Sequence, residues 1–115
     1  MKKIYQLSSC STCIRIIKEL NPDESVVLQN IKVEKITEAQ LEEMRMLAGS
    51  YEALFSKRAM KYKALGLKEI NLGELDYKKL ILEEYTFLKR PVIIINDEIF
   101  IGNSKQTIEQ AKVHF

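Results

Sequence analysis

The spacing of apolar residues changes several times along this chain, and each change predicts a structural element. Residues 3–7 form a short, mostly apolar run that ends at two serines, as expected of a strand. From Ser11 onward the apolar residues recur at helical spacing until Asn21-Pro22 ends the pattern; they are Ile14, Ile17 and Leu20. After a short polar turn, residues 26–33 return to apolar positions that are typical of a second strand.

The middle of the chain, about residues 37–87, is expected to be helical. Thr37 with Gln40 three residues later has the pattern of a capping box, in which each side chain bonds to the backbone of the other residue. The apolar stripe that follows ends at Gly49, a natural helix stop. Three shorter helices are expected after it: one capped by Ser50, one over about residues 59–65 and one over about residues 75–87.

The pattern becomes strand-like again near the end of the chain. Residues 92–95 are consecutive valine and isoleucine residues, which predicts a strand that is buried on both faces. A polar turn over residues 96–98 leads to residues 99–101, which should return as the hairpin partner of that strand. Beyond this hairpin, either Asn103 or Ser104 can cap a last helix.

These elements follow the order β-α-β, helices, β-β-α, which is the layout of the thioredoxin-like fold. We therefore predict a single α/β domain over residues 1–115, with a mixed four-stranded sheet of glutaredoxin type. The first strand should lie at the centre of the sheet. It should run parallel to the second strand, through a right-handed crossover, and antiparallel to the strand at residues 92–95. The helices at about residues 37–87 should form an insertion between the two halves.

Composition narrows the class of protein further. The chain has 115 residues, of which 46% are hydrophobic and 30% charged, and this suits one globular domain. Its formal net charge of +2 gives no general case for a nucleic-acid partner. No apolar run approaches the roughly 18 residues of a membrane span, and no secretory segment follows the basic N-terminus. We therefore expect a cytoplasmic protein with no membrane and no direct nucleic-acid partner.

Two cysteines stand where the first strand is expected to lead into the first helix, in the sequence Cys10-Ser11-Thr12-Cys13. In a reducing cytosol such a pair is more often redox-active or metal-binding than a structural disulfide. A helix N-terminus has unpaired backbone N–H groups and partial positive charge, which favour a thiolate at Cys10. Cys13 is expected near the core beside Ile14 and Ile17, one turn later, where it can attack a mixed disulfide on Cys10. The pair thus predicts a catalytic nucleophile, Cys10, and a resolving thiol, Cys13.

Two other interpretations of the cysteine pair remain open. A zinc site needs about four ligands, whereas the chain offers two cysteines and one histidine, His114. The cysteines can also be small, inert core residues, because unpaired cysteine is often buried. Their placement after a strand and before a helix favours the redox interpretation. We expect no metal ion and no bound cofactor.

Two arginines and a proline are the remaining candidates for the site. Pro91 opens the strand at residues 92–95; an ordinary trans proline there is the default, but in this fold a cis proline beside the reactive cysteine is expected. Arg90 precedes it, and Arg58 lies between two short predicted helices. Guanidinium groups near a thiolate lower its pKa and can bind a tetrahedral oxyanion through paired hydrogen bonds. Arg58, Arg90 and Pro91 are therefore the predicted substrate-binding residues.

Taken together, these segments resemble one family of the thioredoxin-like fold, that of the glutaredoxin-type arsenate reductases and Spx. The resemblance extends over nearly the whole chain and depends on the order and spacing of several blocks. The blocks are Leu7-Ser8-Ser9-Cys10-Ser11-Thr12-Cys13, Phe55-Ser56-Lys57-Arg58, Tyr62-Lys63-Ala64-Leu65-Gly66-Leu67, Leu88-Lys89-Arg90-Pro91-Val92-Ile93-Ile94 and Ile101-Gly102.

The resemblance implies a nucleophilic Cys10 with Arg58 and Arg90 holding an oxyanion beside it. It also implies that arsenate is attacked by the thiolate and that glutathione and glutaredoxin complete the reduction. Two features depart from the reductases. Their third arginine, which follows the last strand, is missing from Gly102-Asn103-Ser104-Lys105, and the second cysteine of the pair is typical of the Spx-like branch.

Three functions follow as hypotheses. The first is a thiol oxidoreductase that acts on a small oxyanion or a thiol substrate, with glutaredoxin as a candidate partner. The second is an Spx-like regulator that binds RNA polymerase and uses the cysteine pair as a redox switch. Against it, the C-terminal residues Ala111-Lys112-Val113-His114-Phe115 lack a strongly basic tail. The third is a binding domain whose thiols do no chemistry.

Overall fold

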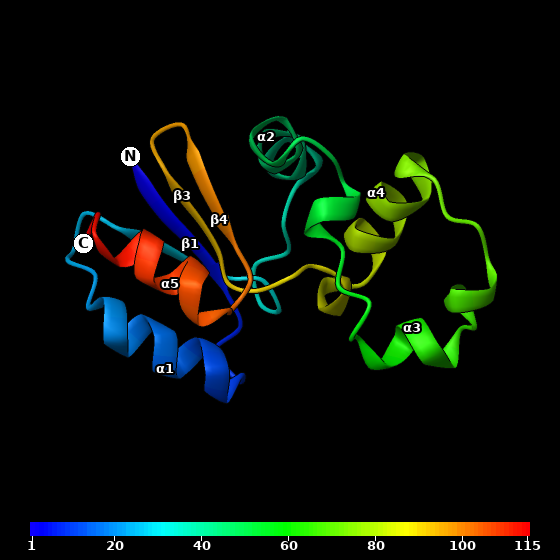
Figure 1. Cartoon of the computed structure of the whole chain (residues 1–115), viewed down its shortest axis with the longest axis horizontal. Helices are drawn as coiled ribbons and strands as arrows, with labels where there is room; N and C mark the ends of the chain where they lie inside the picture. Colours follow the sequence, from blue (N-terminus) through cyan, green and yellow to red (C-terminus); the bar gives the residue numbers. More distant parts are fainter. The chain divides into compact units, whose positions relative to one another are not determined.

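The computed structural model describes all residues, 1–115, and the chain divides into two compact units. The first, here called the sheet unit, contains Met1–Lys35 and Arg90–Phe115. The second, the helical unit, contains Ile36–Lys89. The colours of Figure 1 show that the two ends of the chain contribute to the same unit, whereas the middle of the sequence forms the other. None of the helices combines the length and the apolar character that crossing a membrane requires.

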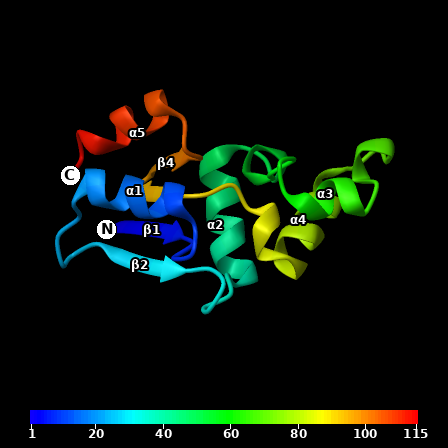
Figure 2. The ribbon, with the colours of Figure 1, turned by 90° about the horizontal axis from the view of Figure 1, so that it is seen from below.

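A four-stranded sheet with the order β2-β1-β3-β4 forms the centre of the sheet unit. Strand β1 is paired on both sides, parallel to β2 and antiparallel to β3, and β3 is antiparallel to β4. Figure 2 shows β1 and β2 side by side and pointing the same way. The elements of this unit are β1 Lys2–Gln6, α1 Ser11–Leu20, β2 Val27–Asn30, β3 Val92–Ile95, β4 Glu98–Ile101 and α5 Lys105–Lys112. The predicted α/β fold with a mixed four-stranded sheet and a central first strand is confirmed.

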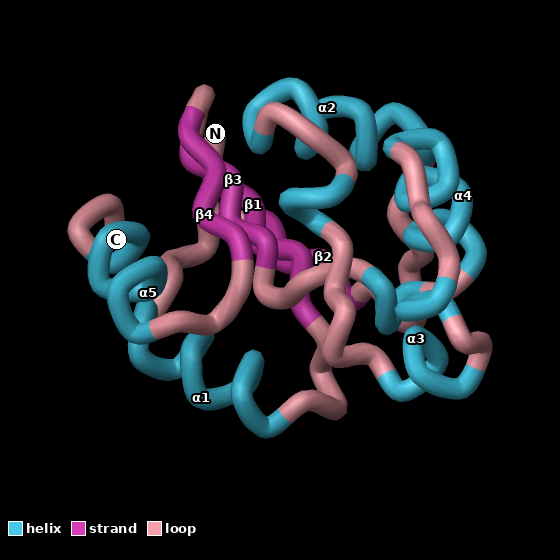
Figure 3. Tube along the Cα trace, turned by 45° about the vertical axis from the view of Figure 1, so that its right-hand side comes forward, coloured by secondary structure: helices cyan, strands magenta, loops and turns pink.

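Helices α1 and α5 cover one face of this sheet (Figure 3). Strand β3 is buried at all four positions, as its run of valine and isoleucine predicted. Burying one such side chain contributes about 1.5–3 kcal/mol relative to leaving it exposed, so this core is the main support for the sheet. The core shared by the helices and the sheet consists of Ile4, Ile16, Leu20, Val26, Ile93, Ile95, Ile108 and Ala111.

The buried face of α1 differs from the predicted one. Cys13, Ile16 and Leu20 are buried, whereas Ile14 is 54% exposed. Positions spaced by three and then four residues form one continuous stripe on a helix, and a neighbouring residue lies about 100° away around the axis. Because Cys13 occupies the stripe, Ile14 points outward. The expectation that Ile14 packs beside Cys13 in the core was wrong.

The second strand is shorter than predicted. Strand β2 ends at Asn30, and residues 31–33 form a turn in which Val33 is 82% exposed. The carbonyl of Asn30 accepts hydrogen bonds from the backbone N–H groups of Val33 and Glu34, at 3.1 and 2.8 Å. The buried side chain of Gln29 donates to the Glu34 carbonyl at 3.0 Å, so the chain curls back instead of continuing the strand.

The helical unit begins with the predicted capping box. Thr37 Oγ1 accepts a hydrogen bond from the Gln40 N–H, and the Gln40 side chain accepts one from the Thr37 N–H. Gly49 ends this helix with a φ of 96°, a left-handed conformation that favours glycine. The elements of the unit are α2 Glu38–Ala48, η1 Glu52–Leu54, α3 Met60–Ala64, η2 Leu67–Glu69, α4 Glu74–Glu83 and η3 Tyr85–Phe87.

Several of these elements are shorter than the sequence pattern indicated. The helix expected after Ser50 is a single 3₁₀ turn, although Ser50 does accept a hydrogen bond from Ala53 N–H. The helix predicted to continue to residue 87 ends at Glu83, because Glu84 adopts an extended conformation. In the sheet unit, Ser104 rather than Asn103 caps α5, through the N–H of Thr107 at 3.1 Å.

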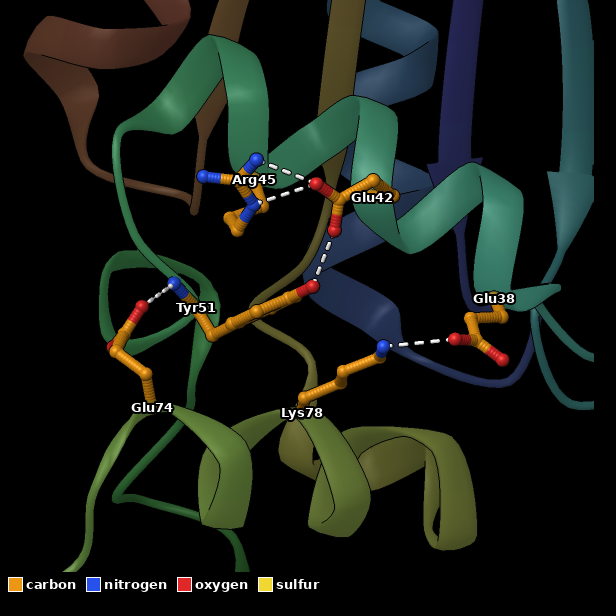
Figure 4. Close-up of polar contacts among 6 residues, drawn as sticks. All are labelled: Glu38, Glu42, Arg45, Tyr51, Glu74 and Lys78. Carbon is orange, nitrogen blue, oxygen red and sulfur yellow. Dashed lines mark hydrogen bonds and ion pairs between the residues drawn. The ribbon is translucent and has the colours of Figure 1, made fainter.

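A polar cluster links α2 to the start of η1 and to α4 within the helical unit (Figure 4). The carboxylate of Glu42 accepts hydrogen bonds from the guanidinium of Arg45 and from the hydroxyl of Tyr51. The carboxylate of Glu74 accepts the backbone N–H groups of Tyr51 and Glu52, at 2.6 and 3.0 Å. The Glu42–Arg45 pair is local, with three residues' spacing on α2, whereas the bonds of Tyr51 to Glu42 and of Glu74 to the backbone join different elements and have no local sequence pattern.

The first prediction concerns Glu42. Hydrogen bonds from Arg45 and Tyr51 lower the pKa of this carboxyl from 4.5 to about 2. A lowered pKa stabilises the folded state above the unfolded pKa, and this stabilisation is lost as the pH falls from about 4.5 toward about 2. Glu42→Gln should therefore lower the urea midpoint of unfolding at neutral pH, and its deficit should vanish near pH 2.

A matched control is Glu43→Gln, since Glu43 is the exposed neighbour on the same helix. This variant should follow the wild type at every pH. A deficit of Glu42→Gln that stays constant down to pH 2 would contradict the electrostatic explanation.

Candidate functional site

The site is built at the point where β1 leads into α1. Cys10 is the N-cap of α1, with φ −92° and ψ 117°, and its carbonyl accepts the N–H of Ile14 at 3.0 Å. Its own N–H donates to the Leu7 carbonyl at 3.0 Å, which closes the turn after β1. Cys10 therefore lies directly after the central strand, at the N-terminus of a helix of ten residues, where the helix carries partial positive charge.

The Cys10 thiol is half-buried, and its pKa is lowered from the ordinary value of 9.0. Burial acts in the opposite direction and would raise the pKa. It is outweighed by the backbone N–H groups of Cys13 and Thr12, by the thiol of Cys13 and by the positive charge of Arg90. All of these favour the thiolate, so Cys10 is the activated sulfur of the pair.

Cys13 has the opposite environment. It is fully buried, and burial, together with the neighbouring charge of Cys10, raises the pKa of its thiol to about 11. The N–H of Leu7 and the charge of Arg90 act against this rise. The two thiols hydrogen-bond to each other, so Cys13 is a protonated donor beside the Cys10 thiolate.

Arg90 and Pro91 belong to the same unit as the cysteines. The Arg90–Pro91 peptide bond is cis, as predicted. Pro91 is buried, and its carbonyl accepts the N–H of Gly102 at 2.9 Å, which ties it to the end of the β3–β4 hairpin. The positive charge of Arg90 acts on both Cys10 and Cys13. Cys10, Cys13 and Arg90 are therefore brought together.

Arg58 belongs to the helical unit. It is exposed and lies between η1 and α3. Its convergence with Arg90 on Cys10 stays a prediction. The structure contains no group of three or more histidine, cysteine, aspartate or glutamate residues that could hold a metal ion, and His114 contacts Glu98 and Phe100 rather than a cysteine.

Sequence reasoning missed the backbone donors and one side chain next to the site. Gln6 is one of only two buried polar residues in the chain, and its amide hydrogen-bonds to the hydroxyl of Ser8. The signal was present in the sequence, because Gln6 is a polar residue inside the otherwise apolar end of the first strand. It could be interpreted only after the turn from Leu7 to Cys10 was known.

This arrangement can perform two consecutive nucleophilic steps. The Cys10 thiolate can attack an electrophilic sulfur or an oxyanion, because it is partly accessible and its pKa is lowered. Cys13 can then attack Cys10, because the sulfurs are in contact and one helical turn lies between the residues. The burial of Cys13 keeps it from reacting first.

The second prediction is a difference in alkylation rate. Cys10 should react with iodoacetamide much faster than Cys13 at neutral pH, because it is accessible and its thiolate is favoured. Its rate should reach half of its plateau below pH 9.0, the ordinary thiol pKa. Mass spectrometry of labelled peptides over time measures both sites in the wild-type protein. Faster labelling of Cys13 would reverse the two roles.

Comparison with known proteins gives a family and a set of related structures. The model of the ArsC family matches residues 5–111. Comparison with curated protein sequences gives no match.

The solved structures that resemble the chain include the YFFB protein, 16% identical over 96% of this chain and 98% of its own, with a TM-score of 0.77. An ArsC family related protein from Bacteroides fragilis is 22% identical over 95% of both chains, with a TM-score of 0.76. An arsenate reductase from Vibrio cholerae is 19% identical over 95% of this chain and 92% of its own, with a TM-score of 0.71. These structures share the fold, and because the family model extends from β1 to α5, the chain belongs to the ArsC family.

Proposed function

We propose that this protein is a thiol oxidoreductase resembling glutaredoxin-dependent arsenate reductase, with Cys10 as nucleophile and Cys13 as resolving thiol. Membership of the ArsC family supports thiol chemistry in general. The observation that carries the specific proposal is that the pKa values of the two thiols are shifted in opposite directions. The pKa of Cys10 is lowered, whereas that of Cys13 is raised to about 11.

An oxyanion substrate fits the charges around Cys10. The N-terminus of α1 and the guanidinium of Arg90 both attract anions, and Arg58 is proposed to join them. In the proposed reaction the Cys10 thiolate attacks arsenic(V) and displaces one oxygen as water. A second thiol then attacks the Cys10 sulfur, and the electron pair of the sulfur–arsenic bond leaves with arsenic as arsenic(III).

The second thiol determines the electron donor. When Cys13 attacks, the product is an internal Cys10–Cys13 disulfide, and an external dithiol or glutathione system must reduce it again. We propose glutathione and glutaredoxin as this donor, with no cofactor bound to the protein itself. The proposal places the reaction in a reducing cytoplasm, where the pair is kept in its dithiol form.

The third prediction tests this function directly. Arsenate should stimulate NADPH oxidation when the protein is coupled to glutathione, glutaredoxin and glutathione reductase. Cys10→Ser should abolish the activity, because no other sulfur is both accessible and activated. Arg90→Lys should lower kcat/KM about tenfold, since replacing a guanidinium fork by a point charge costs roughly one charge-assisted hydrogen bond.

Arg15→Lys is the matched control, because Arg15 is an exposed arginine on the outer side of α1. Its activity should equal that of the wild type. If arsenate stimulates no oxidation while a disulfide substrate is still reduced, the oxyanion part of the proposal falls and the thiol chemistry remains.

A second candidate function is an Spx-like, redox-switched regulator that binds RNA polymerase. It is favoured by the segment after β4, where the reductases carry a third arginine. Here Gly102-Asn103-Ser104-Lys105 has none, and Ser104 is used as the cap of α5. In this function the Cys10–Cys13 disulfide would be the signal rather than a step of turnover.

The fourth prediction separates the two functions. A regulator should retain purified RNA polymerase in a pull-down, and retention should differ between the reduced and the oxidised protein. A Cys10→Ser/Cys13→Ser double variant should lose this difference. If neither the reduced nor the oxidised protein retains RNA polymerase, the regulator is ruled out and the enzyme remains.

A further inference from the structure

The end of β1 carries a polar contact next to the turn that leads to Cys10. Gln6 is buried in the last position of the central strand, only 7% exposed. Its Nε2 donates to the hydroxyl of Ser8 at 3.0 Å, and the same hydroxyl lies 3.4 Å from Gln6 Oε1. Ser8 itself is exposed and lies in the turn that leads to Cys10. The two side chains therefore form a clamp across the single residue between them, Leu7.

Leu7 contacts both cysteines through its backbone. Its carbonyl accepts the N–H of Cys10 at 3.0 Å, and its N–H is directed at the sulfur of Cys13. The carbonyl of Gln6, the preceding residue, is fixed independently by the N–H of Ile31 at 2.9 Å. Gln6, at one end of the clamp, is thus fixed within the sheet, and Ser8, at the other end, lies in the turn before Cys10.

We infer that Gln6 and Ser8 are positioning residues for the resolving step: their hydrogen bond holds the Leu7 peptide so that its N–H stabilises the thiolate of Cys13. This inference rests on the proposed function and deepens it. It assigns the clamp to the second thiol of the pair, whereas the N-terminus of α1 serves the first and Arg90 acts on both.

The resolving step is the one that needs such help. Burial is the largest cause that raises the pKa of the Cys13 thiol, and it still acts when Cys10 is part of a mixed disulfide, so only a small fraction of Cys13 is a thiolate at pH 7. Cys13 is also fully buried, so water cannot stabilise the charge as it forms. The N–H of Leu7 therefore stabilises the Cys13 thiolate, the least populated species in the reaction.

The chemistry of this step is a thiol–disulfide exchange. With a disulfide substrate, attack by Cys10 leaves a mixed disulfide that joins Cys10 to one substrate sulfur. The Cys13 thiol loses its proton to solvent, and the resulting thiolate attacks the Cys10 sulfur. A Cys10–Cys13 disulfide forms, the bond to the substrate sulfur breaks, and the substrate leaves as a thiolate. No further oxidant or reductant is required.

The size of the effect follows from two opposing dependences on pKa. Each unit by which the pKa of Cys13 rises reduces its thiolate fraction about tenfold at neutral pH. The more basic thiolate is also the better nucleophile, with a Brønsted coefficient of about 0.4–0.5, which restores about threefold. The net loss in the rate of resolution is about threefold per unit.

The fifth prediction uses one equivalent of dithiobis(nitrobenzoate), an aromatic disulfide whose released thiolate absorbs visible light. The reduced, full-length protein should release one thiolate when Cys10 attacks and a second when Cys13 resolves the mixed disulfide. Stopped-flow absorbance separates the two phases. Ser8→Ala should slow the second phase, by about threefold for each unit by which the pKa of Cys13 rises, and should leave the first phase unchanged.

The variants around the clamp distinguish positioning from general stability. Ser8→Thr keeps the hydroxyl at an exposed position and should restore the wild-type second phase. Ser9→Ala, at the exposed neighbouring serine, should change neither phase. Gln6→Leu should slow the second phase like Ser8→Ala, and the double variant should be no slower than either single variant, because both remove the same bond.

Three results would overturn the inference. Ser8→Ala could leave the second phase unchanged, it could slow both phases by the same factor, or Ser8→Thr could be as slow as Ser8→Ala. A wild-type protein with no first phase would refute the proposed function, and the inference would fall with it. A normal first phase with an insensitive second phase would refute the inference alone.

Discussion

The pairing of β1 on both of its edges is the interaction on which the site depends. Parallel β2 fixes one side of the strand and antiparallel β3 the other, so the end of β1 has little freedom. The turn that follows therefore presents Cys10 at the N-cap of α1 in a defined orientation. Arg90 and Pro91 reach the same region because they immediately precede β3.

A single short stretch of backbone gives the two cysteines different chemistry. The free N–H groups of the first turn of α1 face Cys10, whereas the stripe of α1 that packs on the sheet includes Cys13. The difference between the sulfurs follows from their positions along the helix. Cys10 is the half-buried N-cap, beyond the edge of the core, whereas Cys13 lies one turn further on and is buried.

Much of this arrangement could be predicted from the sequence, because strands, caps and the cysteine motif have local signatures. The buried run of β3, the capping box at Thr37 and the placement of Cys10 before a helix all follow from spacing. The choice between Ile14 and Ile16 could not be predicted, since both are isoleucine and only contact with the sheet decides which is buried. The bond between Gln6 and Ser8 depends on the turn geometry, and the contacts of Glu42 and Glu74 depend on tertiary structure.

The sheet unit is built from two segments that are separated by the whole helical unit. During synthesis on a ribosome, β1, α1 and β2 emerge long before β3, which pairs with the other edge of β1. Until Arg90 and β3 arrive, the nascent chain carries both thiols without the strand that completes their surroundings. The part of the thiol environment that Arg90 and β3 supply is therefore acquired late in translation, after the helix N-terminus that holds Cys10.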